Sequence, residues 1–194
     1  MREVKSVLLV GVGGQGTILA AKLLTLGLMA AGYDVKMSEI HGMSQRGGSV
    51  SSQVRYGERV LSPVIEHGGA DILVSFEKME ALRWLEYLKV SGEVIVNDYE
   101  IPSMPVLSGA TEYPERILEE LCTKANTIVI NAAEEAEKLG SAKAMNVVLL
   151  GAAVRLLGLE DIDWAAIIKD NVKPQFVDLN LKAFETGKVL AEKR

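Results

Sequence analysis

The 194-residue chain is poor in the residues that most often carry crosslinks, metals or proton transfer. Its one cysteine, Cys122, cannot form a disulfide within the chain or supply the several thiolates that hold an iron–sulfur cluster. Because Cys122 ends the segment Ile-Leu-Glu-Glu-Leu-Cys at 117–122, we expect a buried, unreactive thiol. The two histidines, His41 and His67, have no cysteine or acidic cluster at a metal-binding spacing, so no metal site is predicted.

The chain also lacks a long apolar run and an excess of positive charge. The apolar stretch at residues 18–31 contains Lys22, and the stretch at 145–159 is short and contains Arg155. Because a strand is expected within a few residues of the N-terminus, no room is left for a signal peptide. The 26 acidic side chains outnumber the 21 basic ones, which disfavours nucleic acid as a partner. We therefore expect a cytoplasmic protein that is not embedded in a membrane.

Apolar residues, in contrast, are abundant. They make up 48% of the chain, which indicates a buried parallel sheet, a partner interface, or both. Short apolar runs alternate with helical patterns, so we predict an α/β fold of three layers, α/β/α, with a mixed, mostly parallel Rossmann-like sheet. The predicted strands lie at residues 6–11, 33–38, 49–56, 71–76, 92–97 and 127–130, with a return strand at 59–61 that forms a hairpin with 49–56.

Helices are predicted between these strands and over the C-terminal part of the chain. The helix at 145–157 is apolar nearly all round, which places it inside the domain or against a partner. No repeat, low-complexity tract or break in composition marks a boundary, so residues 1–194 are predicted to form a single domain. The predicted helices lie at residues 15–31, 77–89, 114–124, 145–157 and 177–193. One further helix is predicted to begin at the acidic segment 161–163.

The segment VLLVGVGGQGT near the N-terminus is a buried-strand run followed by a glycine-rich turn and the start of a helix. Gly11, Gly13 and Gly16 fit the spacing G-x-G-x-x-G, which lets a second backbone or a phosphate approach the main chain. Free N–H groups at the helix start favour an anion. The ribose-binding acid of a nicotinamide site is expected about 20 residues further on, and neither Asp34 nor Glu39 fits well. A dinucleotide, another phosphate-bearing ligand and a purely structural turn therefore all stay open.

A second glycine-punctuated segment, HGMSQRGG at residues 41–48, follows the second predicted strand. An arginine beside glycines offers a forked cation next to exposed N–H groups, which suits phosphate or carboxylate. Loops after parallel strands leave at the same edge of a sheet, so Gln15 and Arg46 are expected to face one crevice. The structural alternative is that Arg46 forms an ion pair with an acid such as Glu39 or caps the end of a helix.

No constellation of side chains indicates a chemical catalyst in this chain. Glu39, Glu77 and Asp98 have no partner at a spacing suited to acid–base catalysis, so they are expected to be solvated or ion-paired. Trp84 and Trp164 fall on predicted helices, where packing in a core or an interface is the usual role.

The two glycine segments together resemble the gamma-type subunit of the 2-oxoacid:ferredoxin oxidoreductases. The resemblance rests on GVGGQG at residues 11–16 and SQRGGSV at 44–50, and it extends over nearly the whole chain, including residues 146–151. Residues 39–48 are most similar to the branch of the family that acts on indolepyruvate. By this resemblance, the parent complex decarboxylates a 2-oxoacid on thiamine diphosphate, reduces ferredoxin through iron–sulfur clusters and releases an acyl-CoA.

The resemblance also implies how this chain takes part. Thiamine diphosphate and the 4Fe-4S clusters would lie on a larger partner subunit, and this chain would be inactive alone, with no tightly bound cofactor and no catalytic side chain. Coenzyme A is expected at the interface, with Arg46 as a candidate for its phosphates. The residues expected to line that crevice are Gly13, Gly14, Gln15, Gly16, Thr17, Arg46, Gly47 and Gly48.

Two other functions stay open on the residues alone. A stand-alone Rossmann-type nucleotide-binding protein or dehydrogenase predicts an acid at the end of the second strand, turned toward the glycine loop. A non-enzymatic sensor of a phosphorylated ligand shares the loop but needs no partner. Both predict binding by the isolated chain, whereas an obligate subunit requires its complex. A homodimer of the isolated chain is also compatible with the sequence.

Overall fold

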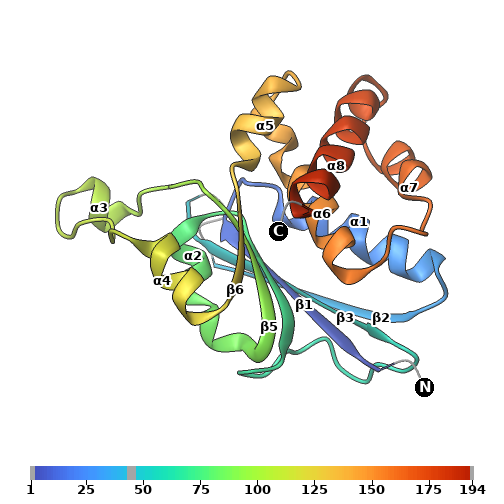
Figure 1. Ribbon diagram of the computed structural model, residues 1–194, viewed down its shortest axis with the longest axis horizontal. Coiled ribbons are helices and arrows are strands. Elements are labelled where there is room, and N and C mark those ends of the chain that lie inside the picture. The colour runs from blue at the N-terminus through green and yellow to red at the C-terminus, as the bar shows by residue number, and fades with distance from the viewer. Residues whose placement is uncertain (1–2, 43–46, 193–194) are drawn as a thin grey trace.

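The computed structural model describes residues 3–42 and 47–192, and its strands form a six-stranded sheet in the order β2-β3-β1-β4-β5-β6 (Figure 1). Strand β3 is antiparallel to both of its neighbours, whereas β1, β4, β5 and β6 are parallel, so β2 runs in the same direction as β1. The predicted mixed, mostly parallel α/β sheet is confirmed. The strands are β1 (Lys5–Val12), β2 (Asp34–His41), β3 (Ser49–Gly57), β4 (Ala70–Ser75), β5 (Leu88–Asn97) and β6 (Asn126–Ile130).

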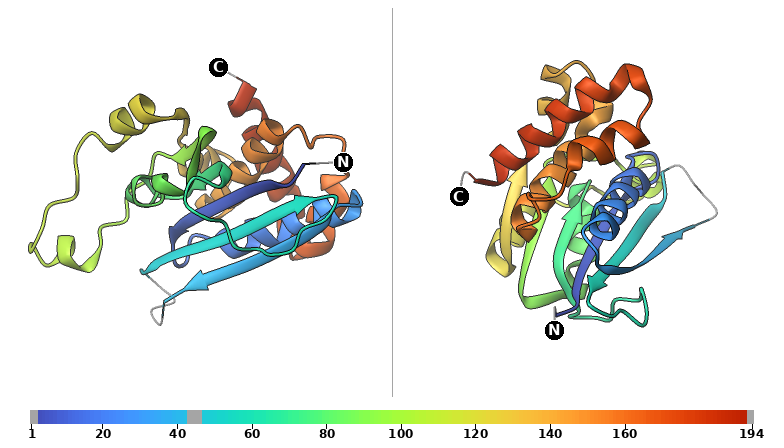
Figure 2. Two further views of the ribbon diagram at one scale, coloured as in Figure 1. Left: turned by 90° about the horizontal axis from the view of Figure 1, so that it is seen from below. Right: turned by 90° about the vertical axis from the view of Figure 1, so that its right-hand side faces the viewer.

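Helices cover both faces of the sheet, which explains why the central strands are apolar along their whole length. In β1, Val7 and Leu9 pack into the core on one face, while Leu8 and Val10 pack into the core on the other. Figures 1 and 2 show the resulting three layers. The larger core lies under α1 (Thr17–Ala30), α5 (Ala132–Lys138), α6 (Met145–Leu157), α7 (Trp164–Asn171) and α8 (Val177–Glu192), and the smaller core under α2 (Lys78–Arg83) and α4 (Ile117–Lys124).

Helices α6 and α8 pack closely because each presents a glycine to the other. A Cβ atom on Gly151 would lie 2.0 Å from the carbonyl oxygen of Phe184, and one on Gly187 would lie 1.8 Å from that of Val148. No side chain fits in these positions without moving a backbone. Residues 146–154 of α6 are all buried, so this apolar helix is covered within its own chain.

Two predicted element boundaries on the β3–β5 side are wrong. Residues 58–69 contain no strand, because the hairpin partner of β3 is β2, which precedes it in the chain. The helix predicted at 77–89 ends at Arg83, and a short 3-10 turn, η1 (Leu85–Tyr87), leads directly into a longer β5. The helical pattern of residues 84–89 is overridden because these residues turn the chain back into the sheet.

The predicted burial of Cys122 is also wrong, since its side chain is exposed. Helix α4 turns Ile117 and Leu121 into the smaller core, and Cys122 follows Leu121 on the outward face. An amphipathic helix buries only one stripe, so the residue after a buried position faces away from the core.

Along the described part of the chain, no helix is both long and apolar enough to cross a lipid bilayer.

Candidate functional site

The loops that follow the parallel strands meet at one edge of the sheet, here called the carboxyl edge. It carries the glycine loop after β1 (residues 13–16), Gly47 and Gly48 before β3, and a projecting segment after β5 (residues 98–116). In open α/β sheets, ligands bind outside this edge. Arg46, the predicted cation of the site, lies outside the described residues.

The two predicted glycine segments are in direct contact with each other. The Gly13 N–H donates a hydrogen bond to the Gly48 carbonyl at 2.8 Å, and the Gly47 N–H donates to the Gly13 carbonyl at 3.3 Å. Gly47 has a φ of +78°, a conformation that favours glycine. The close approach that these glycines permit is therefore used by a second segment of the same backbone.

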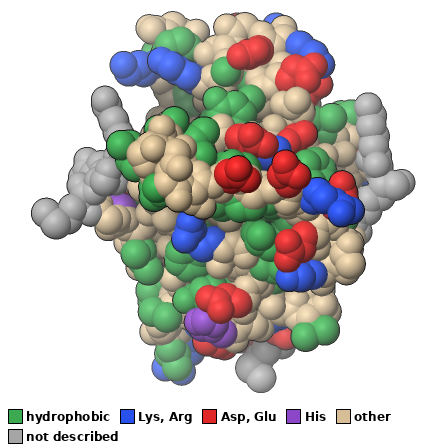
Figure 3. All heavy atoms as spheres, turned by 90° about the vertical axis from the view of Figure 1, so that its left-hand side faces the viewer, with side chains coloured by type: hydrophobic (Ala, Val, Ile, Leu, Met, Phe, Trp, Pro, Cys, Tyr) green, Lys and Arg blue, Asp and Glu red, His purple; other side chains and the backbone are tan. Residues whose placement is uncertain are grey.

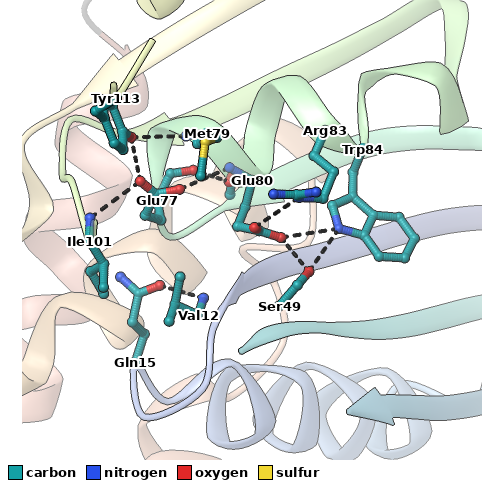
Figure 4. Close-up of polar contacts among 11 residues, drawn as sticks. Val12, Gln15, Ser49, Glu77, Met79, Glu80, Arg83, Trp84, Ile101 and Tyr113 are labelled. Atoms are coloured by element: carbon teal, nitrogen blue, oxygen red, sulfur yellow. Dashed lines mark hydrogen bonds and ion pairs between the residues drawn. The ribbon is translucent and has the colours of Figure 1, made fainter. Parts of the chain in front are cut away.

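Gln15 holds the glycine loop from inside the protein. Its side chain is buried; its Oε1 accepts from the Val12 N–H at 2.8 Å (Figure 4), and its Nε2 donates to the Phe76 carbonyl at 2.7 Å. The Asn97 amide donates to the same carbonyl at 3.1 Å and accepts from the Ala132 N–H at 2.9 Å. Gln15 and Asn97 thus tie together the chain segments that leave β1, β4, β5 and β6. Both amide ends of Gln15 are satisfied by the protein, so its role here is to position the loop.

Gly16 forms the N-cap of α1 in a left-handed conformation, with a φ of +85°. Its carbonyl accepts a hydrogen bond from the Asn146 amide at 3.3 Å, and a Cβ at Gly16 would lie 2.5 Å from that amide nitrogen. Thr17 is buried, whereas Gly14 is exposed with open space above it. No side chain caps the N-terminus of α1, so its first N–H groups and its dipole favour an anion.

Two hollows flank the glycine loop, and both are bounded by Gly14 and Gly16. The first, of about 340 Å³, also touches Gly13, Thr17, Ile18, His41 and Val50. The second, of about 310 Å³, is closed by the segment after β5, by α5, and by residues 142–146 before and at the start of α6, among them Tyr99, Glu137, Lys143 and Asn146. The exposed ammonium of Lys143 and the N-terminus of α1 thus border the same space, which suits a phosphate-bearing ligand.

Tyr99, Lys143 and Asn146 were not predicted as site residues. Asn146 carried a signal, because it is a polar residue in the first turn of an otherwise apolar helix. Tyr99 and Lys143 carried none, since only the folded chain brings the segment after β5 and the residues before α6 to the glycine loop.

Glu77 was expected to be solvated or ion-paired, but it is a fully buried hydrogen-bond acceptor (Figure 4). Its carboxylate accepts from the Glu80 N–H at 2.9 Å, which caps α2, from the Ile101 N–H at 3.3 Å and from the Tyr113 hydroxyl. Burial and this hydrogen bond to Glu77 raise the pKa of Tyr113 above its usual value, so the phenol stays protonated and keeps donating. The Met79 N–H donates to the same hydroxyl at 3.2 Å.

The other predicted carboxylates have structural partners or face solvent. Asp98 lies 3.2 Å from the Lys78 ammonium, as the ion-paired interpretation predicts, and Lys78 also pairs with Glu100. Burial lowers the pKa of Lys78, but its hydrogen bonds to Glu100 and Asp98 outweigh burial and raise it overall. Glu39 is exposed on β2 and lines neither hollow.

The arrangement does not match a dinucleotide site. Such a site needs an acid on the strand beside β1, turned toward the glycine loop. Here the antiparallel strand β3 lies between β1 and β2. Glu39, on β2, is therefore one strand further from the glycine loop than such a site requires. Within residues 3–42 and 47–192, no group of three or more His, Cys, Asp or Glu side chains is placed to hold a metal ion.

The two tryptophans pack as predicted. Trp164 is buried, donates to the Leu159 carbonyl at 2.8 Å and packs against Phe184. Trp84 is half-buried beside α2, where its N–H donates to the Glu80 carboxylate at 3.3 Å (Figure 4). Both residues stabilise the two helical layers and leave the carboxyl edge to other side chains.

Comparison with known proteins places this geometry in a family. Residues 6–189 match the family described as pyruvate ferredoxin/flavodoxin oxidoreductase. The indolepyruvate oxidoreductase subunit IorB of Thermococcus kodakarensis is 39% identical over 189 residues, which are 94% of this chain and 93% of that protein. The 2-oxoglutarate synthase subunit KorC of Methanothermobacter marburgensis is 28% identical over 191 residues, 96% of each chain.

The fold agrees with a solved structure from the same group of enzymes. The gamma subunit of the keto/oxoacid ferredoxin oxidoreductase of Geobacter sulfurreducens superposes with a TM-score of 0.73 over 98% of this chain and 99% of that one, at 23% identity. That likeness confirms the predicted fold class.

Proposed function

The chain belongs to the pyruvate ferredoxin/flavodoxin oxidoreductase family, and from that premise we propose that it is the small, gamma-type subunit of a 2-oxoacid:ferredoxin oxidoreductase. The reaction of the complex is oxidative decarboxylation of a 2-oxoacid to an acyl-CoA, with reduction of ferredoxin. The observation that carries this proposal is the 39% identity to a small oxidoreductase subunit over nearly the full length of both chains. The same match supports treating residues 1–194 as one domain.

The proposed substrate is an aryl pyruvate such as indolepyruvate. This chain is 39% identical to an indolepyruvate oxidoreductase subunit and 28% identical to a 2-oxoglutarate synthase subunit over similar lengths. The difference supports the aryl pyruvate branch, which residues 39–48 also favour.

We propose that thiamine diphosphate and the 4Fe-4S clusters lie on a larger partner subunit, through which ferredoxin is reduced. With one cysteine in its sequence, this chain has too few thiolates to hold such a cluster alone. The contribution of this chain would be to complete the interface at which coenzyme A is used.

The residues of the carboxyl edge fit the phosphates of coenzyme A. Gly14 leaves open space above the loop, Gly16 begins α1 without a side-chain cap, and Lys143 borders the same hollow. We propose that these groups, with Arg46, bind the phosphates, while Gly13, Gln15, Thr17, Gly47 and Gly48 shape the crevice. Coenzyme A supplies the thiol that accepts the acyl group; this chain supplies the anion site.

The experiment is to co-express the tagged chain anaerobically with the larger subunit from the same organism. The complex is purified by the tag, and the eluate is assayed for dye reduction. We expect reduction of a low-potential dye that needs both coenzyme A and an aryl pyruvate, and that is absent from either subunit alone. A chain that elutes without the larger subunit would refute the proposed function, and activity confined to pyruvate or 2-oxoglutarate would refute the substrate.

The coenzyme A site is tested with Arg46→Ala and Lys143→Ala in the assembled complex, with Lys124→Ala as the control. Lys124 lies on α4, ion-paired with Glu120 and away from the glycine loop. We expect the KM for coenzyme A to rise about tenfold for each of the first two variants, since one charge-assisted phosphate contact contributes about 1.5 kcal/mol. An unchanged KM in both would place coenzyme A elsewhere.

A further inference from the structure

The segment at residues 98–116, here called the arm, projects from the carboxyl edge away from the sheet and from both helical layers (Figures 1 and 2). It connects β5 to α4 and contains one short helix, α3 (Met104–Leu107). The backbone hydrogen bonds of residues 103–111 are local, as in Leu107 N–H to the Ser103 carbonyl at 2.9 Å. A single isolated helical turn is not stable in water, so its conformation needs support from elsewhere.

The base of the arm is fixed by the buried carboxylate of Glu77. This carboxylate accepts from the Ile101 N–H on the outgoing side and from the Tyr113 hydroxyl on the returning side, as Figure 4 shows. On the outgoing side, the Lys78 N–H also donates to the Tyr99 carbonyl at 3.0 Å. Pro102 and Pro105 restrict the backbone between these anchors, and Pro114 restricts it directly after Tyr113. The arm is thus held in one direction although its tip has little tertiary packing.

The tip of the arm is apolar and exposed. Residues 101–111, with the sequence IPSMPVLSGAT, contain no charged side chain, in a chain of which 24% is charged. Met104 is 75% exposed and Leu107 is 66% exposed, at positions where α3 presents them to solvent. Large apolar side chains held outward on a preorganised segment are typical of anchors that enter a groove on a partner.

Charge and position indicate what kind of partner covers the tip. The arm carries four acids and one base, Arg116; Asp98 and Glu100 pair with Lys78 at its base, whereas Glu112 and Glu115 lie on its returning side. Figure 3 looks onto the side from which the arm projects and shows several acidic side chains gathered beside apolar ones. Two copies of this chain that met arm to arm would bring these acids together, which disfavours self-association. An apolar groove with a basic rim is the complementary surface.

The base of the arm is continuous with the candidate site. Tyr99 lines the same hollow as Gly14 and Gly16, so a subunit that covers the glycine loop also comes within reach of the arm. Because Met104 and Leu107 lie beyond that base, they would contact the partner outside the crevice itself.

We infer that the arm is a docking element for the larger, thiamine-bearing subunit, with Met104 and Leu107 as anchors in an apolar groove whose rim carries Lys or Arg. This inference rests on the proposed function, and it adds the surface by which the subunit is held. Glu77 and Tyr113 are positioning residues that aim the arm.

The test compares two double variants in the co-expressed complex. Met104→Ser with Leu107→Ser removes the anchors of the arm, and Leu61→Ser with Val64→Ser is the matched control. Leu61 and Val64 are also exposed, but they lie between β3 and β4 at the opposite edge of the sheet. We expect the arm variant to weaken subunit association by about 10- to 100-fold, because anchor truncations commonly cost tenfold or more each. The control should bind like the wild type, and both isolated variants should keep the wild-type melting temperature.

Each other outcome counts against the inference in a distinct way. Equal binding by the arm variant and the wild type would overturn the inference and leave the proposed function in place. A wild-type chain that binds no larger subunit would overturn both. Arm-dependent self-association of the isolated chain, measured by sedimentation, would assign the tip to a second copy and overturn the choice of partner.

The basic rim is tested by charge reversal. Glu112→Lys with Glu115→Lys should slow association about tenfold at low salt and weaken its salt dependence, since rim charges act mainly on the association rate. Asp170→Lys on α7, an exposed acid away from the arm, is the control. An unchanged association rate for the first variant would rule out a basic rim.

Discussion

Helix α6 and the tip of the arm are both apolar segments, but only α6 is covered by its own chain. Residues 146–154 of α6 are buried against α1, α5 and α8, whereas Met104 and Leu107 on the arm are largely exposed. Because α6 is apolar nearly all round, the sequence pattern left open whether it lies inside the domain or against a partner. The structure shows that the stronger pattern belongs to the core, whereas the shorter, proline-bounded segment stays exposed on its own chain. Apolar content alone therefore does not locate an interface; the exposed fraction of the side chains does.

The burial of α6 against α8 is tested most strongly by Gly151→Ala. Alanine raises helix propensity by about 1 kcal/mol over glycine in an open helix, so without tertiary contact the variant should be more stable. Here the added Cβ would meet the Phe184 carbonyl, and we expect the free energy of unfolding to fall by about 3 kcal/mol. Urea unfolding measures it, with Val189→Ala on the exposed part of α8 as the control. A stabilised variant would mean that α6 and α8 can separate, and that α6 is less firmly covered than described.

The glycine loop sharpens the comparison, because it lies at the exposed carboxyl edge but is held by the buried side chain of Gln15. Gln15→Ala removes both hydrogen bonds of the buried amide and leaves the Val12 N–H without its acceptor. We expect a loss of about 2 kcal/mol in the free energy of unfolding, the usual penalty for an unsatisfied buried donor and the lost bond. The assembled complex should also lose affinity for coenzyme A, because the glycine loop is no longer held.

Gly14→Ala tests the same loop by a different cause, since any loss of stability there comes from backbone strain and not from a lost hydrogen bond. Its Cβ would meet nothing, although the positive φ of +107° adds local strain. A Gln15→Ala chain with wild-type stability would contradict the positioning role of the amide.

The fixed direction of the arm is tested by Tyr113→Phe. Loss of the hydroxyl removes a hydrogen bond to the buried Glu77 carboxylate while Ile101 and the α2 cap remain. We expect thermolysin to cleave residues 102–112 of the isolated chain about tenfold faster, which corresponds to about 1.4 kcal/mol of local stability. The melting temperature should change little, because the tip is not part of either core. Tyr99→Phe, at the other side of the base, should be cleaved at the wild-type rate.

The sequence predicted the sheet well because its signals are local. Unbroken apolar runs such as that of β1 occur where helices cover both faces of a sheet, and the glycine segments marked the loops of the carboxyl edge. The position of β3 between β1 and β2 could not be predicted, since strand order depends on long-range pairing rather than on any run of residues.

The candidate site was predicted in its backbone but not in its side chains. Gly13, Gly47 and Gly48 come together as expected, and Gln15 lines the second hollow, but its amide is directed inward and donates to the Phe76 carbonyl. Glu77 was expected to be solvated or ion-paired, because one carboxylate gives no sign of the three donors that separate segments bring to it. Such roles depend on tertiary contacts that no spacing encodes.

The smallest effect is expected far from both regions, at Asp34 near the start of β2. Its carboxylate accepts hydrogen bonds from the Lys36 ammonium and from the Val60 N–H at 2.7 Å, and these lower its pKa in that order of importance. Since the pKa is lower in the folded than in the unfolded chain, ionised Asp34 stabilises the fold above the unfolded pKa. That contribution is lost as the pH falls through the folded pKa.

Asp34→Asn should therefore lower the urea midpoint at about pH 6, and the difference from the wild type should shrink as the pH falls from about 5 to about 3. Because Asp34 is accessible to solvent, the shift should be smaller than that of Gly151→Ala or Gln15→Ala, and weaker again in high salt. Asp170→Asn, an exposed acid on α7, provides the baseline. A difference that does not change with pH would contradict stabilisation by the ionised Asp34 carboxylate. In either case the effect should leave the arm and subunit association unchanged, because the contact lies at the opposite edge of the sheet.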